Sequence, residues 1–80
     1  MKEQPNERKQ AIALKRAVVR LIKRGMVRER IGRPELARRL HASPAQVDRV
    51  LDPRDTAVRL DATLSAARAV NQKVRIVVGR

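Results

Sequence analysis

Residues 33–51, RPELARRLHASPAQVDRVL, constrain the fold more than any other stretch of the chain. Apolar residues recur at helical spacing on both sides of a short turn, which predicts two short helices packed face to face. Ser43 can cap the second helix, Pro44 suits its first position and Gln46 completes a capping box. The spacing is typical of a helix-turn-helix, which places its second helix in the DNA major groove. The residues expected to face inward are Leu36, Ala37, Leu40, Val47 and Val50.

His41, the only histidine, stands in the turn between these two helices. A left-handed backbone conformation is expected there, for which glycine is the usual residue and histidine is tolerated better than most. We therefore interpret His41 as structural or phosphate-facing and not as catalytic.

The composition bounds the kind of protein. Eighty residues form one domain at most, without cysteine and therefore without disulfides. Phe, Trp and Tyr are absent, so the core must consist of Leu, Ile, Val, Ala and Met. The lack of aromatic residues also argues against binding single-stranded nucleic acid by base stacking.

The formal net charge of +12 indicates a polyanionic partner. Residues 1–40 carry 13 Lys/Arg and 4 Asp/Glu, a net +9, and residues 41–80 carry the remaining +3. Such a field favours phosphate backbones, and we expect double-stranded DNA. A membrane-surface binder or a merely soluble basic protein is the alternative.

The first helix is expected from Asn6 to about residue 24, ended by Gly25, after a flexible segment 1–5. Ile12 and Val19 lie seven residues apart and form a second, narrow apolar seam. We expect this seam to pack against the C-terminal segment or a second subunit; the alternative is that the two residues are scattered apolar residues on the surface. The main apolar stripe is Ala11, Leu14, Ala17, Val18, Leu21 and Ile22. The basic residues expected on the other side are Lys9, Arg16, Arg20, Lys23 and Arg24.

A last helix is expected at 61–70, after a loop at 52–59, with Asn71 as a left-handed cap. Its inward residues are Leu60, Leu64, Ala67 and Val70. The β-branched segment 73–78 reads as one strand, whose dimer-facing residues are Val74, Ile76 and Val78. Because a lone strand needs a partner, we expect antiparallel pairing in a homodimer, with the sheet edge of another protein as the alternative.

The exposed face of the second motif helix supplies the candidate base-reading residues. Arg49 is the strongest, because arginine can bridge O6 and N7 of guanine. Ala45 can contact a thymine methyl, and Gln46 can read adenine unless capping occupies it. Pro44 and Asp48 are the remaining base-reading candidates. For Asp48, a salt bridge to an arginine is the favoured role. Candidate phosphate contacts are Arg33, Arg38, Arg39, Ser43 and Arg54, supplemented by basic residues of the first helix.

The segments 35–40, ELARRL, and 47–51, VDRVL, resemble the Cro and lambda-repressor type of helix-turn-helix, also called the xenobiotic-response-element family. Through 61–78 the chain is similar to small DNA-binding antitoxins of the HicB and HigA kinds. The resemblance implies a bundle of four or five helices that represses its own operon as a dimer. It assigns Arg33 to a phosphate, and Pro44, Ala45 and Arg49 to base reading. The chain departs from the family at His41, where glycine is usual, at Pro44, and in a longer connector at 26–33.

We therefore predict a mainly α domain over residues 6–80, a four- to five-helix bundle with one C-terminal strand. The predicted function is a dimeric DNA-binding regulator, a repressor, in the cytoplasm and associated with the nucleoid. The alternatives are an antitoxin that also binds a toxin, an architectural or excision factor of a mobile element, and an RNA-binding protein. No catalytic residues, metal ligands or cofactors are expected, because no nucleophile triad, ligand cluster or phosphate loop is recognisable.

Overall fold

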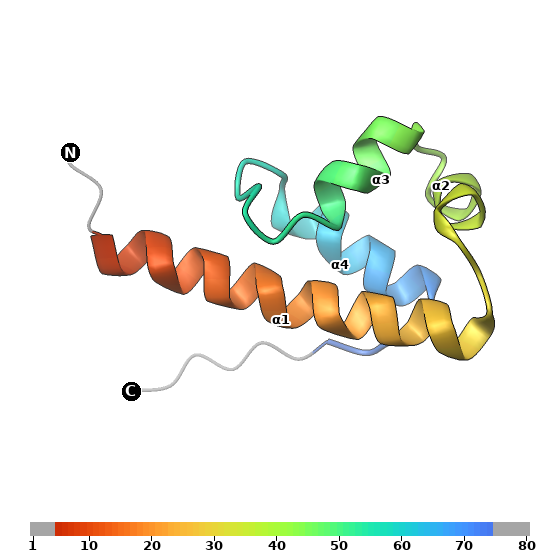
Figure 1. Cartoon of the computed structure of the whole chain (residues 1–80), viewed down its shortest axis with the longest axis horizontal. Helices are drawn as coiled ribbons and strands as arrows, with labels where there is room; N and C mark the ends of the chain where they lie inside the picture. The colour runs from red at the N-terminus through yellow and green to blue at the C-terminus, as the bar shows by residue number, and fades with distance from the viewer. Residues whose placement is uncertain (1–4, 75–80) are drawn as a thin grey trace.

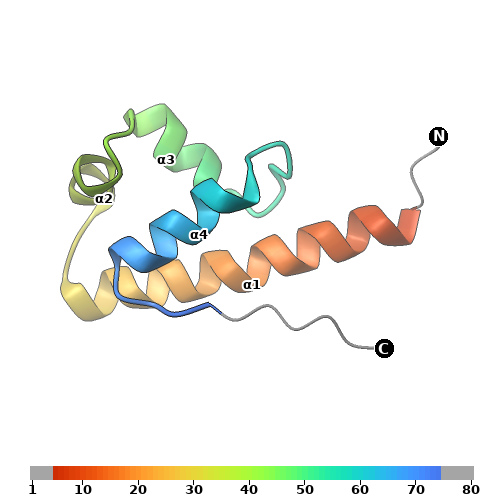
Figure 2. The same ribbon diagram turned by 180° about the vertical axis from the view of Figure 1, so that it is seen from behind.

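The computed structural model describes residues 5–74, which form four helices and no strand. They are α1 (Pro5–Glu29), α2 (Arg33–Leu40), α3 (Pro44–Val50) and α4 (Leu60–Ala69). The long α1 lies along one side of the molecule, and α4 packs against it while also contacting α2 and α3 (Figure 1). Seen from behind, the chain after α4 turns back along α1 (Figure 2). The predicted compact, mainly helical bundle is thus confirmed.

The hydrophobic core draws on all four helices. Its side chains are aliphatic and small, so the helices must approach closely for the interior to be filled without voids. Full burial of a Val, Leu or Ile side chain contributes roughly 1.5–3 kcal/mol. The buried core residues are Val18, Val19, Ile22, Leu36, Ala37, Val47, Val50, Leu51, Ala66, Ala67 and Val70.

Gly25 does not end the first helix, so that prediction is wrong. The helix continues to Glu29 and stops where Arg30 adopts a left-handed backbone conformation, with φ of 57°. Gly25 is buried where the end of α4 crosses α1, and an added Cβ would lie 2.6 Å from Cγ2 of Val70 and 2.8 Å from its carbonyl oxygen. A glycine inside a helical pattern signals either a helix end or a close approach. Here it permits a close approach.

The buried face of α1 is rotated relative to the predicted stripe. Ala11, Leu14 and Ala17 are exposed, whereas Val19, assigned to a second seam with Ile12, belongs to the core. The N-terminal part of α1 extends past the other helices in both views (Figures 1 and 2), so apolar residues there have little to pack against. The other predicted members of the stripe are buried or half-buried: Val18, Leu21 and Ile22.

The last helix starts at Leu60, within a residue of the expected position. Asn71 adopts the predicted left-handed conformation after it, with φ of 60°. Leu60 was expected inside but is 44% exposed, because it opens the helix at the edge of the bundle. Thr63 and Ala66, a turn or two further on, fill the interior instead.

The expected C-terminal strand lies mostly outside the described residues. Lys73 and Val74 are described and are not in a strand, although Val74 packs against the core. Ile76 and Val78 belong to residues 75–80, which lie outside the described part, so the paired-strand dimer stays a prediction. At the other end, Pro5 belongs to α1 and not to a flexible segment, and residues 1–4 are likewise outside.

Candidate nucleic-acid interface

The turn between α2 and α3 has the conformation that the sequence predicted. His41 ends α2 in the left-handed region, with φ of 53° and ψ of 44°. Its amide donates to the carbonyl of Arg38 at 3.3 Å, and the amide of Ala42 donates to the carbonyl of Ala37 at 2.9 Å. These two bonds satisfy the last carbonyls of α2 as a Schellman cap does. The chain therefore leaves α2 in one defined direction.

The start of α3 is fixed by reciprocal hydrogen bonds between Ser43 and Gln46. The Ser43 hydroxyl accepts from the Gln46 amide at 3.1 Å, and Gln46 Oε1 accepts from the Ser43 amide at 2.8 Å. Pro44 takes a first-turn position that needs no amide hydrogen. The predicted capping box is confirmed. The side-chain oxygen of Gln46 accepts within the cap, so its side-chain nitrogen is the group better placed to read a base.

Opposite faces of α3 have different tasks. Val47 and Val50 are buried, and α3 packs against α2 and α4, which anchors the helix. Pro44, Ala45 and Asp48 are exposed, so the outer side of α3 is open to a ligand. This is the division that a recognition helix requires.

Arginines of α2 and α3 are held in ion pairs. Arg33 Nη1, at the start of α2, lies 2.6 Å from Asp48 Oδ1 on α3. Arg49 Nε donates to Asp55 Oδ2 at 3.0 Å, which lowers the pKa of the Asp55 carboxyl below its usual value. Asp48 thus pairs with an arginine, as favoured from the sequence. A nucleic acid that binds Arg33 or Arg49 must share that arginine with its aspartate partner or displace the aspartate.

Glu35 holds both arginines that follow it on α2. Arg38 donates to both of its carboxylate oxygens, and Arg39 Nε donates to Oε2 at 3.0 Å. The hydrogen bond from Arg38 and then that from Arg39 lower the pKa of the Glu35 carboxyl to about 2. The carboxylate therefore stays charged at any physiological pH.

Arg39 also joins three helices. Its Nη1 donates to Glu29 Oε1 at 2.8 Å and to the carbonyl of Ala69 at 2.9 Å. The side-chain amide of Asn71 donates to the same Glu29 carboxylate. Arg39 was predicted as a phosphate contact, and the structure places it in a network that ties α2 to the ends of α1 and α4.

Lys15 on α1 is a structural residue that sequence reasoning missed. It is 6% exposed, and its ammonium donates to the carbonyls of Arg49 at 2.8 Å and Asp55 at 2.5 Å. Burial lowers its pKa, and the nearby aspartates oppose that shift. The cation sits at the C-terminal end of α3, where the helix dipole is negative. It holds α3 and the following loop against α1.

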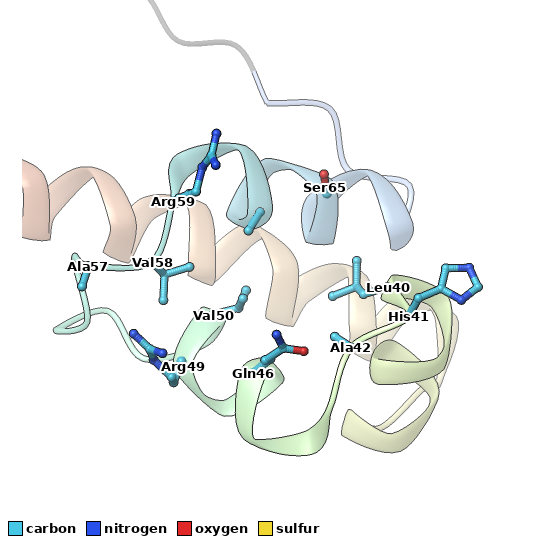
Figure 3. A pocket seen from close by; sticks show the side chains of 11 residues that line it. Leu40, His41, Ala42, Gln46, Arg49, Val50, Ala57, Val58, Arg59 and Ser65 are labelled. Carbon is cyan, nitrogen blue, oxygen red and sulfur yellow. The ribbon is translucent and has the colours of Figure 1, made fainter.

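A groove of about 540 Å³ separates α3 from α4 and the loop before it. Figure 3 shows Gln46 and Arg49 on the α3 side, and Arg59 and Ser65 on the other. Apolar side chains line it between them, including Leu40, Val50 and Val58. Two base-reading candidates therefore stand on the flank of α3 that borders this groove.

Two hollows along α1 gather basic side chains from different elements. One is lined by Arg16 of α1 and Arg54 of the loop after α3. The other is lined by Lys23, Arg30 and Arg33, with apolar residues between them. The predicted phosphate contacts Arg33 and Arg54 thus lie beside α1.

The described residues hold no group of three or more His, Cys, Asp or Glu side chains that could bind a metal ion. None of the described helices combines the length and the apolar composition needed to cross a membrane. No protein-family model matches the chain, and comparisons with curated proteins and with solved structures find no match. The geometry and charge of the described residues are therefore the features that bear on function.

Proposed function

We propose that the chain is a sequence-specific, double-stranded DNA-binding regulator that inserts α3 into the major groove and acts as a dimeric repressor. The observation that carries this proposal is the α2–turn–α3 unit. Its turn is capped on both sides, its inner face is buried and the outer face of α3 is open. The net charge of +12 supplies attraction to phosphate.

The dimensions of α3 suit this role. An α-helix with its side chains is about 10–12 Å in diameter, which fits a major groove roughly 12 Å wide, and the seven residues of α3 run about 10 Å along the groove. Ala45 offers a methyl group to thymine, and the Arg49 side chain, 59% exposed, can reach guanine by exchanging Asp55 for the base. Arg33 holds only Oδ1 of Asp48, so the second carboxylate oxygen can accept from cytosine.

Selection of duplexes from a random library tests the proposal. The wild-type chain should enrich one sequence motif, and Arg49→Ala should weaken binding to that motif by roughly 1–3 kcal/mol while relaxing one base position. Arg68→Ala is the matched control, because Arg68 is an exposed arginine on α4, outside the α2–turn–α3 unit. Unchanged affinity and preference in Arg49→Ala would show that α3 does not read DNA in this way.

A further inference from the structure

We propose that one exposed face of α1 is the main phosphate-binding surface of the protein and holds the backbone of double-stranded DNA regardless of sequence. This surface, the α1 stripe, consists of Lys9, Arg16, Arg20 and Lys23. The proposal rests on the proposed function in taking duplex DNA as the ligand. It goes further in assigning most of the affinity to a helix outside the helix-turn-helix.

The four residues share one side of α1. Their spacings of seven, four and three residues bring each cation back to the same face of a helix. All four are exposed, whereas the opposite face of the helix carries the buried Val18 and Ile22. From Lys9 to Lys23 the stripe runs about 21 Å, which is long enough to follow several phosphates of one strand.

The cations of the stripe have no competing partner among the described residues. Within the part of the chain that the structure describes, none of the four side chains makes an ion pair or a side-chain hydrogen bond. The arginines of α2 and α3, in contrast, are all paired with carboxylates. Unpaired cations can each displace a counterion from DNA, whereas a paired arginine must first give up or share its carboxylate.

The stripe is continuous with the helix-turn-helix side of the molecule. Arg16 lines a hollow together with Arg54, which follows α3. Lys23 lines another together with Arg33, which opens α2. Figure 1 shows α1 running past both the start of α2 and the loop after α3. A duplex strand on the stripe would therefore lie next to the recognition unit.

The salt dependence of binding tests this assignment. Fluorescence anisotropy with a labelled 20-base-pair duplex of random sequence, between 50 and 200 mM NaCl, gives the slope of log K against log[NaCl]. The variant K9Q/R16Q/R20Q/K23Q should have a slope shallower by about 3–4, since each lost phosphate contact removes roughly 0.9. Glutamine keeps helix propensity, and circular dichroism would verify the fold.

A charge-matched variant separates contact from net charge. R24Q/R28Q/R68Q/K73Q also removes four exposed cations but leaves the stripe intact. It should keep most of the wild-type slope. An equal loss of slope in both variants would overturn the proposal, because only the total charge would then matter. An amide NMR titration of the unmutated chain should independently show shifts on the stripe, and shifts confined to α2 and α3 would also overturn it.

The two proposals can fail separately. If a motif is selected and depends on Arg49 but the slope survives loss of the stripe, the α1 assignment fails alone. If the stripe controls binding but no motif is enriched, sequence reading by α3 fails and the α1 assignment stands. An RNA hairpin of equal length, bound more tightly than the duplex through the same four residues, would overturn duplex DNA as the ligand.

Discussion

Helix α1 and the α2–turn–α3 unit use positive charge in different ways. α1 holds eight Lys/Arg and two Asp/Glu, a net +6, and its stripe cations are unpaired within the described residues. Together, α2 and α3 hold four arginines and two acidic residues, and each arginine has a carboxylate partner. Among the described residues, the α1 stripe presents cations without a carboxylate partner, whereas α2 and α3 use their charge to hold their own shape.

The difference reflects how each region is held in the fold. The short α2 and α3 have little buried area of their own, so ion pairs and caps add to the packing that orients them. α1 is held by an apolar face, by the buried Lys15 and by the close approach at Gly25. The side chains of the α1 stripe are therefore not needed to hold α1 in place. The following predictions test this contrast from the largest expected effect to the smallest.

Gly25→Ala should give the largest loss of stability, about 1–3 kcal/mol, because the new methyl would overlap the backbone oxygen of Val70. The gain in helix propensity, about 1 kcal/mol, does not offset a clash with main chain. Thermal unfolding should show a lower Tm, by roughly 4–8 °C for each kcal/mol. Because the effect is steric, it should be the same in low and high salt.

The exposed α1 position 17 provides the matched control for that substitution. Ala17→Gly should cost only the propensity difference, roughly 0.5–1 kcal/mol, since nothing packs closely there. A Gly25→Ala protein that is more stable than wild type would mean that α1 and α4 can separate without loss. The account of packing at this crossing would then be wrong.

Glu35→Gln should change how stability depends on acid. The folded-state pKa of Glu35, about 2, lies below its ordinary value of 4.5. The carboxylate therefore stabilises the fold above pH ~4.5, and this contribution disappears as the pH falls toward 2. Chemical denaturation from pH 7 to 2 should give a shallower loss of stability for Glu35→Gln than for wild type.

Substitution of Arg38, one of the two partners of Glu35, provides a check on that result. Arg38→Gln should act in the same direction, because the hydrogen bond from Arg38 is the largest cause of the lowered pKa. Curves that stay parallel to wild type between pH 4.5 and 2 would argue that Glu35 does not stabilise this helix pair.

The pair Arg33–Asp48 should show the smallest effect. Both side chains are more than half exposed, so a double-mutant cycle with Arg33→Gln and Asp48→Asn should give roughly 0.2–1 kcal/mol. The coupling should vanish near 1 M NaCl, in contrast to the loss at Gly25. A coupling that persists at high salt would indicate that the pair is shielded from solvent in solution.

Features that depend on neighbours in sequence were predictable. Ser43, Gln46 and His41 act within a few residues of themselves, and caps and left-handed turns depend on just such short patterns. The end of α4 at Asn71 belongs to the same class.

Features that depend on distant residues were not predictable. Lys15 binds carbonyls 34 and 40 residues away, and Gly25 meets Val70. Lys15 shares the helical spacing of Val18 and Ile22, which was a signal that it lies on the buried face. The sequence pattern assigns Lys15 to neither face, and a lysine is almost never fully buried unless paired. The carbonyls that pair with it come from the loop after α3 and the end of that helix.

The contact at Gly25 also bears on how this chain can be stabilised. Main chain meets side chain there with no room for a methyl group, and the molecule is only 16 Å across in its shortest dimension. An interior that thin accommodates one layer of aliphatic side chains, which is consistent with a sequence that has no aromatic residue. Enlarging core residues would push the helices apart. Gains in stability would instead have to come from helix ends, such as the start of α2 at Gly32, which has no side-chain cap, and from surface charge.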